Sequence, residues 1–478
     1  MAITWPTTPT FLLEARKDQY NDAGVTYAVP GDAVYRSILQ IPTGGKYVEH
    51  ATANNRPYLL GGTKIGPPSI EFPPNATAGG GNRYLHNEAL GLGAAIGTQN
   101  TTILVCGTCQ LRQQSGAGVI QNSIAVKTGS YVVDDHYGLG VYGNEIVQYN
   151  GGLAATPPTP KRSGLFAPHT RAVWGYRADG TNVTFVSGKL RTTQAVGASG
   201  SSNSSISIGG GYLGGLPFIG AIDQLVAWGS ALTDSQLRSA VESMQDEFGI
   251  VRDPKTLICY IGDSNTAGMG QPSGTYASDN MAWTRKVDMA LTGGGGHVSY
   301  NCGIYNQKAS QWVSNWTANG VGTIAAAHPE MAKIAVVWAG GPDLGAGDSA
   351  ATVLANLVSL VGLCRASGFS YVIVCTIPPR TGSAGPEAAR VSLNASILAG
   401  NTGANAVVDV DGLFPATVSY ATPKDNPFWI NQADDIHIRG TGHSMIALPM
   451  ANAIRAVTHV DIGGVLKFGP PCVLRNRQ

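Results

Sequence analysis

The chain has few charged residues and no long apolar run. Only 13% of its 478 residues are Asp, Glu, Lys or Arg, against roughly 25% in an average soluble protein. The formal net charge is +1, so composition gives no reason to expect nucleic acid or an anionic membrane as a partner. No stretch of about 18 consecutive apolar residues occurs, and hydropathy therefore predicts no membrane-spanning helix.

The N-terminal segment lacks the pattern of a signal peptide, and the cysteines lack the pattern of a metal site. MAITWPTTPTFLLEARKDQY has no basic region followed by an apolar stretch, so we expect no secretory leader. The seven cysteines form an odd, scattered set. Cys106 and Cys109 form a CxxC, but no second pair follows at zinc spacing. Because most cysteines lie in apolar runs, we expect core packing and synthesis in a reducing cytoplasm.

Glycine, by contrast, is abundant, and residues 1 to about 230 have the pattern of short strands between turns. The chain contains 63 glycines. Thr101–Gly107, Asn182–Ser187 and Ser205–Ile208 are short β-branched runs bounded by Gly, Asn or Ser. Ser187 and Gly188 supply a hairpin turn. Many short strands with frequent turns predict an all-β sandwich.

One helix is expected at the end of this half. Thr233 is a candidate N-cap, and Gln236 stands three residues later, which makes a capping box. Gly249 is expected to end the helix. Apolar residues fall at the spacing of one helical face, namely Leu237, Ala240, Val241, Met244 and Phe248.

Two segments of the first half resemble concanavalin A-like (laminin G-like) jelly rolls. Gly220–Ile250 is similar to the closing strand and helix of that family, and Phe11–Asp18 (FLLEARKD) resembles its first strand. The resemblance implies a jelly-roll domain over residues 1–250, with carbohydrate binding or plain assembly as its role. Laminarinase-like members carry ExDxxE on one strand, whereas Gly220–Val226 contains only Asp223. A glycosidase is therefore not expected.

After a linker at residues 251–255, the pattern changes to alternating strands and helices. Leu257–Ile261, Ile334–Ala339 and Tyr371–Ile377 are continuous apolar runs, which are typical of buried parallel strands. Ala350–Ser367 carries apolar residues at helical spacing. These runs predict an α/β domain over residues 256–459, and the resemblance described below implies a flavodoxin-like parallel sheet in an α/β/α arrangement. Residues 460–478, rich in Gly and Pro, are expected to lie across the surface as a C-terminal extension.

The first chemical signal is Gly262-Asp263-Ser264-Asn265, which directly follows an apolar strand. Catalytic groups of open α/β sheets gather at the carboxyl ends of strands. A serine that begins the next helix also lies beside free backbone N–H groups, which can hold an oxyanion. The alternative is that Ser264 is an ordinary polar helix cap.

The second signal is Asp434-Asp435-Ile436-His437, which precedes an apolar helix. An Asp three residues before a His can fold back over one turn and accept the Nδ1–H of the imidazole. The Nε2 of His437 is then left to take a proton from a serine hydroxyl. The apolar residues after this segment are Met445, Ile446, Leu448, Met450 and Ala451.

Together these segments resemble the SGNH (GDSL-type) hydrolases over residues 256–457. The resemblance implies that Ser264 is the nucleophile, His437 the base and Asp434 the residue that orients the base. It implies that Asp263 is a structural hydrogen-bonding residue beneath the serine and that His443 is structural. It implies no cofactor, and no HExxH or paired His/Cys set in the sequence suggests a metal.

Two further blocks resemble this family but depart from its pattern. The family glycine that lends an oxyanion-hole N–H falls on Asn306, which tolerates positive φ; Gly303 is the alternative, and the N–H of Ser264 is a further donor. Trp338–Asp343 resembles the family's GxND block. Here Pro342 replaces the asparagine donor, and it has neither an N–H nor a donating side chain. Losing one such donor costs about 3 kcal/mol of transition-state stabilisation. Gly341 and Asp343 are expected to support that loop.

These features lead to one expectation and its alternatives. We expect a serine esterase that removes O-acetyl groups from a bacterial surface or extracellular polysaccharide. We expect it to be a component of a phage tail spike or fibre, either as a homo-oligomer or attached to other virion proteins. The low charge and the Gly/Ser/Asn richness are typical of virion proteins. The alternatives are a glycan-binding adhesin or structural virion protein with weak or no activity, which Pro342 favours, and a cytoplasmic or unconventionally secreted bacterial enzyme.

Overall fold

The computed structural model shows two compact units, each with its own sheets. The first is built from Met1–Gln110 and Ala117–Arg252, and the second contains Asp253–Gln478. The division falls inside the segment where the sequence pattern changes. The residues that the structure describes are 5–9, 11–14, 19–20, 36–38, 47–49, 58–60, 69–72, 85–87, 100–109, 120–128, 135–142, 145–149, 161–166, 168–195, 206–208, 218, 220–268, 282–291, 296–379, 384–414, 429–431, 434–438, 440–458 and 472–474.

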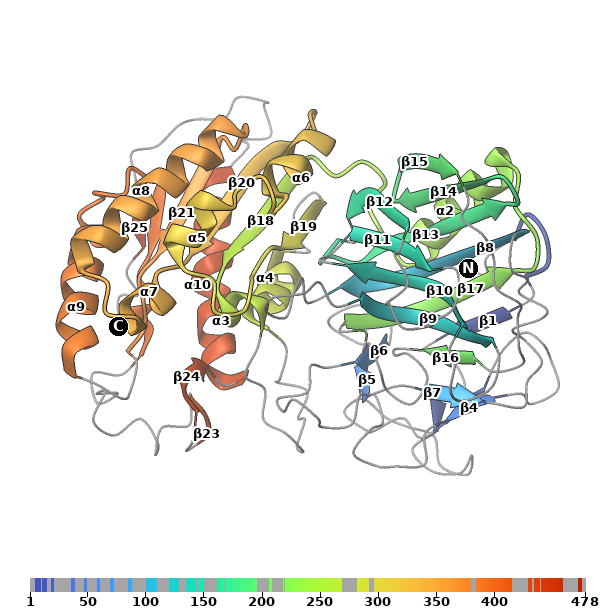
Figure 1. The fold of residues 1–478 in the computed structure, drawn as a ribbon, viewed down its shortest axis with the longest axis horizontal. Helices are drawn as coiled ribbons and strands as arrows, with labels where there is room; N and C mark the ends of the chain where they lie inside the picture. The colour runs from blue at the N-terminus through green and yellow to red at the C-terminus, as the bar shows by residue number, and fades with distance from the viewer. Residues whose placement is uncertain are drawn as a thin grey trace. The chain divides into compact units, whose positions relative to one another are not determined.

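The first unit contains two antiparallel sheets (Figure 1). The eight-stranded sheet has the order β15-β14-β13-β8-β17-β6-β5, with β1 also paired to β17; the nine-stranded sheet has the order β12-β11-β10-β9-β16-β7-β4-β3-β2. The strands of the eight-stranded sheet are β1 (Phe11–Glu14), β5 (Tyr58–Leu60), β6 (Ser69–Phe72), β8 (Asn100–Cys109), β13 (Ala172–Asp179), β14 (Asn182–Ser187), β15 (Leu190–Ala195) and β17 (Gly220–Trp228). Those of the nine-stranded sheet are β2 (Gln19–Tyr20), β3 (Arg36–Ile38), β4 (Tyr47–Glu49), β7 (Leu85–Asn87), β9 (Ile120–Thr128), β10 (Asp135–Tyr142), β11 (Glu145–Tyr149), β12 (Lys161–Phe166) and β16 (Ile206–Ile208).

This unit has two hydrophobic cores, one on each face of the eight-stranded sheet. On β8, Ile103 and Val105 belong to the core between the sheets. The alternate residues Leu104 and Cys106 belong to a second core, which α2 (Asp234–Glu247) covers on the outer face of the sheet. Side chains alternate between the faces of a strand, so a continuously apolar strand supplies both cores.

The local predictions for this unit are confirmed, and so is the fold class. Thr233 caps α2, and the capping box with Gln236 is formed. Gly249 follows the helix at φ 61°, a conformation that favours glycine. The first and last strands of the sandwich, β1 and β17, pair antiparallel. The antiparallel sandwich fits the predicted jelly roll.

The second unit is built on a six-stranded parallel sheet. Its order is β19-β18-β20-β21-β22-β25, which confirms the predicted α/β class. The strands are β18 (Thr256–Gly262), β19 (His297–Asn301), β20 (Ala332–Trp338), β21 (Tyr371–Cys375), β22 (Ala406–Val408) and β25 (Cys472–Leu474); β23 (Trp429–Asn431) and β24 (Asp434–Ile438) form a separate antiparallel pair.

The last strand corrects part of the prediction for residues 460–478, namely the part at Cys472–Leu474. Within that segment, Cys472–Leu474 extends the sheet as the edge strand β25, parallel to β22, and is not irregular. Three residues between Pro-rich and polar segments carry too short a pattern to be recognised as a strand. Their place depends on the free edge that β22 offers, which the local sequence does not reveal.

The helices of the second unit form two groups. In one group α4 packs against α10, and in the other α8 packs against α5 and α9 (Figure 1). Among the helices that the structure describes, none combines the length and the apolar character needed to cross a bilayer. Their bounds are α3 (Ser264–Ala267), α4 (Trp283–Leu291), α5 (Ala309–Ser314), α6 (Val321–Ala327), α7 (Gly341–Gly345), α8 (Ala350–Ala366), α9 (Ala384–Leu398) and α10 (Gly440–Thr458), with a 3₁₀ turn, η3 (Asp411–Leu413).

Candidate active site

The strand order places the chemical signals at one point of the parallel sheet. The chain runs from β18 to β19 on one side and then to β20 on the other side of β18. Ligands of doubly wound sheets bind outside the carboxyl ends of the strands where the order reverses. Here Ser264 follows β18, and Gly341 and Pro342 follow β20. A pocket at this place is lined by Asp263, Ser264, Asn265, Tyr305, Asn306, Trp338, Gly341, Pro342, Ile377, Pro378 and His437.

Ser264 and His437 meet inside this pocket although 173 positions separate them in the sequence. Ser264 is the first residue of α3, directly after the strand. Its Oγ lies 2.8 Å from Nε2 of His437, a distance that suits donation of the serine O–H to the ring nitrogen. Both residues are buried. A hydroxyl next to a base, at the carboxyl end of a strand, is the arrangement that activates a serine for nucleophilic attack.

The segment that carries His437 differs from the expectation. A turn was expected to fold Asp434 back toward His437, whereas Asp434–Ile438 is the strand β24, with Asp434 opposite Asn431 of β23. Pairing with β23 holds this stretch extended, which a local pattern of four residues does not predict. The side chain of Asp434 lies outside the described residues, so its predicted contact with the imidazole stays a prediction.

The backbone geometry distinguishes Asn306 from its alternative, Gly303. Asn306 lines the pocket and has a φ of 53°, the positive value expected of a residue in the place of a glycine. The N–H of Gly303 instead donates to Oδ1 of Asn301 at 2.9 Å. A Cβ on Gly303 would lie 2.2 Å from the backbone nitrogen of Ala267, so this glycine permits close packing against α3. The Gly303 N–H is thus paired with Asn301 and the residue is not among those that line the pocket, so Asn306 is the candidate donor that the geometry favours.

Pro342 stands where the resemblance calls for a donor, and it faces the pocket. It lies at the start of α7, where a proline costs no helical hydrogen bond because the first N–H groups of a helix have no partner within it. Gly340, two residues before Pro342, has a φ of 114°, a value that excludes most side chains. Neither Pro342 nor the glycines before it, Gly340 and Gly341, has a side chain that can donate a hydrogen bond to the pocket.

Asp263 and Asp343 hold the loops of the site. Asp263 caps α3, since its carboxylate accepts the N–H of Asn265 at 2.9 Å. Asp343 is fully buried and accepts the N–H groups of Ala309 at 2.7 Å and Ser310 at 3.4 Å, at the start of α5. Burial raises the pKa of Asp343, although these two donors oppose the shift. The carboxylate thus ties α7 to the loop that carries Asn306.

His443 anchors the last helix. Its Nδ1 accepts the backbone N–H of Trp283 at 3.1 Å, which joins α10 to α4. Burial, together with the charges of Lys286 and His437, lowers the pKa of His443 to about 3. The ring is therefore neutral near pH 7, in agreement with a structural role.

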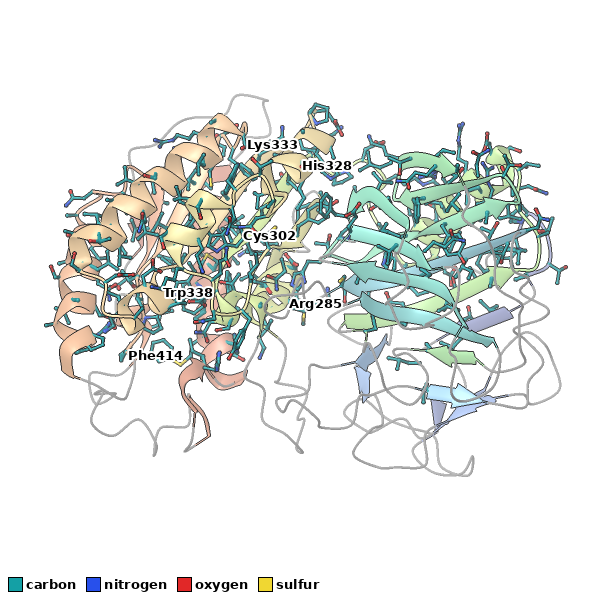
Figure 2. All side chains as sticks on the ribbon, in the orientation of Figure 1. Arg285, Cys302, His328, Lys333, Trp338 and Phe414 are labelled. Carbon is teal, nitrogen blue, oxygen red and sulfur yellow. The ribbon has the colours of Figure 1, made fainter. Side chains whose placement is uncertain are left out.

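Five pocket residues were given no role in the site by the sequence analysis: Asn265, Tyr305, Trp338, Ile377 and Pro378. Asn265 and Tyr305 are the sequence neighbours of Ser264 and Asn306. Trp338 begins the GxND-like block that contains Pro342. Trp338 is the last residue of β20 (Figure 2). Ile377 and Pro378 follow β21, so the rule that sites gather at carboxyl ends of parallel strands would have found them.

A buried polar network fixes the wall that Ile377 and Pro378 form. Asn394 accepts the N–H of Ile377 and donates to its carbonyl, both at 2.8 Å. Arg390 donates to the same carbonyl at 2.8 Å and pairs with Glu387 and Asp411. Satisfied networks of this kind rigidify the segment that they hold.

Comparison with known sequences assigns a family to this region. Residues 260–445 match the GDSL-like Lipase/Acylhydrolase family. No curated protein matches the chain.

Several solved structures share low identity with parts of the chain. For the second unit, a member of the lipolytic G-D-S-L family from Veillonella parvula has 18% identity and a TM-score of 0.31, over 43% of this chain and 99% of its own. An acetyl-xylooligosaccharide esterase from Geobacillus Stearmophilus has 17% identity and a TM-score of 0.32, over 42% and 94%. The CBM40 of Ruminococcus gnavus IT-sialidase, bound to sialyllactose, has 15% identity and a TM-score of 0.26, over 31% and 85%.

The site geometry and the family match describe the same stretch of chain. The match begins within β18, just before Ser264, and ends within α10, just after His437. The second unit therefore carries a GDSL-like acylhydrolase domain, and the protein is a serine hydrolase of the ester-hydrolysing kind.

Proposed function

We propose that the protein is a carbohydrate O-acetylesterase in which Ser264 is the nucleophile and His437 the general base. The observation that carries this assignment is the 2.8 Å contact between Ser264 Oγ and His437 Nε2 inside the pocket. Asp434 is the candidate for orienting His437 because it occupies the first position of the DxxH block, by the resemblance to the SGNH hydrolases. The assignment requires no metal, because a serine activated by an imidazole is itself a sufficient nucleophile.

The reaction then proceeds in two acyl transfers. His437 Nε2 takes the proton of Ser264 as Oγ attacks the carbonyl carbon of the ester, and the carbonyl oxygen becomes an oxyanion. The C–O bond to the sugar breaks, and His437 returns the proton to the leaving alcohol, which leaves an acyl-serine. Water repeats the sequence: its proton goes to His437, its oxygen attacks the acyl carbon, and Ser264 leaves as the hydroxyl.

The oxyanion needs donors about 3 Å away. Two candidates line the pocket: the backbone N–H of Ser264, at the first position of α3, and that of Asn306, turned by its positive φ. The first N–H groups of a helix have no partner within the helix. Since Pro342 cannot supply the third donor, we infer a hole that works but is weaker than one with an asparagine at this position.

A sugar-bearing substrate is favoured by the aromatic residue at the pocket. Tyr305 is 38% exposed although it is a large aromatic residue. Its ring stacks on the imidazole of His437, with centroids 6.4 Å apart and an interplanar angle of 25°. An exposed aromatic face next to a catalytic base offers a rigid amphipathic surface for the alcohol part of the ester. The all-β sandwich of the first unit is the second element that could hold a glycan.

The proposed setting is a phage tail spike or fibre that acts on a bacterial surface or extracellular polysaccharide, as a homo-oligomer or attached to other virion proteins. Its support is compositional: 13% of residues are charged, and glycine is abundant. The proposal places the esterase in the virion or outside the cell after release.

Acetate release tests this function. Purified protein is incubated with a panel of acetylated bacterial polysaccharides and with 4-nitrophenyl acetate, and acetate is measured enzymatically. We expect release from at least one polysaccharide. Tyr305→Ala should raise KM on that polysaccharide several-fold while leaving the small ester unaffected, with Tyr305→Phe as the matched control that keeps the ring. Equal effects of Tyr305→Ala on both substrates would contradict a carbohydrate-binding role.

Pro342 favours a second candidate, a glycan-binding protein with little or no turnover. In that case the protein would bind a polysaccharide in a pull-down or by calorimetry and release no acetate from it. Hydrolysis of the bound polysaccharide would exclude this candidate.

A further inference from the structure

The strand that carries His437 is not part of the central sheet. β24 pairs with β23 in a separate two-stranded sheet whose register is irregular. Ser264, by contrast, follows a strand that has parallel neighbours on both sides. The backbone hydrogen bonds of the central sheet therefore position the nucleophile but not the base. Contacts outside the central sheet therefore help to set the distance between them.

One such contact is made by the residue next to the nucleophile. Oδ1 of Asn265 accepts the backbone N–H of Ile438 at 3.2 Å. Asn265 is 8% exposed and lines the pocket, and Ile438 is fully buried. Ile438 directly follows His437, so one short helix holds the base twice: Ser264 bonds to its ring, and Asn265 bonds to the backbone of its neighbour.

The helix itself is held firmly at this point. The N–H of Asn265 donates to the carboxylate of Asp263 at 2.9 Å, and the N–H of Ala267 donates to the carbonyl of Asp263 at 3.0 Å. Asn301 reaches the same helix, since its Nδ2 donates to the carbonyl of Thr266 at 2.9 Å. The Asn265 side chain therefore projects from a fixed support, as a positioning group requires.

We propose that Asn265 is a positioning residue that docks β24 onto α3 and thereby sets the Ser264–His437 distance. This inference rests on the proposed esterase function. Without an acceptor at position 265, the buried N–H of Ile438 loses its partner, and β24 is expected to shift until that group finds another. A shift of about 1 Å at a reacting pair can cost on the order of 100-fold in rate. Residues that contact only the substrate keep their places, so the loss falls on kcat rather than KM.

Three variants of the full chain test the proposal on 4-nitrophenyl acetate. Asn265→Leu keeps the branching at Cγ and removes the acceptor, and kcat should fall by about 10- to 100-fold while KM changes by less than about twofold. Asn265→Asp keeps an acceptor oxygen and should retain more of kcat than Asn265→Leu. Thr266→Val is the matched control on the same helix, because the Thr266 hydroxyl has no hydrogen-bond partner among the described residues, and it should behave as the wild type.

Circular dichroism and thermal unfolding are recorded for each variant. If Asn265→Leu does not fold, Asn265→Ser replaces it, since a serine hydroxyl is too short to reach Ile438. A fall in kcat that Asn265→Asp partly restores supports the proposal. A folded Asn265→Leu with the kcat of Thr266→Val, or an Asn265→Asp that is as slow as Asn265→Leu, overturns it. A wild type without any turnover of the small ester would instead overturn the proposed function.

Discussion

The two units bury polar side chains in different ways. In the sandwich, Arg171 donates to Asp223 from Nε at 2.6 Å and from Nη2 at 3.3 Å, and Cys106 lies against the same carboxylate. The positive charge of Arg171 is thus paired with the negative charge of Asp223. In the α/β unit, Ser264 and His437 pair with each other and also line a pocket.

The contrast indicates when a buried polar group serves function. Burial and pairing alone describe both sites, and a bidentate ion pair is a common structural solution for a buried charge. The α/β site combines pairing with a pocket at the carboxyl ends of parallel strands. We therefore interpret Asp223 as structural and Ser264 as catalytic, and the following experiments can separate the two interpretations.

The largest effect is expected at the nucleophile. Ser264→Ala removes the attacking oxygen, and turnover of 4-nitrophenyl acetate should fall by about 10³-fold or more. Thermal unfolding should stay near that of the wild type, because only one oxygen is lost. The matched control is Ser359→Ala, which removes an exposed serine hydroxyl on α8, outside the pocket. Activity near the wild-type value in Ser264→Ala would remove the central assignment.

The next effect concerns stability rather than rate. Asp223→Ala leaves Arg171 without its buried partner and should destabilise the first unit by about 3 kcal/mol, as measured by chemical denaturation. Asp246→Ala breaks an exposed pair with Arg252 and should change little, since surface pairs contribute weakly. The kcat of the folded Asp223→Ala protein should be unchanged. A lost kcat with normal stability would mean that Asp223 serves catalysis after all.

A smaller effect is expected where the site lacks a donor. Pro342→Asn should raise kcat by about tenfold, part of the contribution of one oxyanion donor. Pro342→Ala is the control, because it relaxes the backbone in the same way and adds no side-chain donor. If both variants match the wild type, another group already supplies the third donor; Asn306→Gly, which keeps the backbone N–H, then tests whether that group is the Asn306 side chain.

The smallest effect tests whether the units work independently. A fragment of residues 256–478 should be soluble and should hydrolyse 4-nitrophenyl acetate within about twofold of the full chain, as expected for separately folding domains. On an acetylated polysaccharide the fragment should show a higher KM if the sandwich binds glycan. An insoluble or inactive fragment would show that the esterase depends on the first unit.

Much of the fold could be predicted because its signals are local. The capping box at Thr233 and Gln236 and the apolar run before Ser264 are each recognisable within a few residues. The same holds for the change of pattern near residue 251. The hydrophobic periods of helices and strands are visible within short stretches of sequence. A serine between a buried strand and a helix is therefore placed by its immediate neighbours.

The rest depended on partners that are distant in the sequence. Whether Gly303 or Asn306 faces the pocket was decided by the packing of Gly303 against Ala267. The segment Asp434–Ile438 became a strand because β23 pairs with it, and Cys472–Leu474 became a strand because β22 had a free edge.

The sequence alone proposes Ser264 and His437 as nucleophile and base, since nucleophilic and basic character are properties of residue types. How these residues meet depends on the tertiary structure, through contacts such as that of Asn265 with Ile438. Such pairings form between segments that no local pattern connects, because their register is set by the packing of the whole α/β unit.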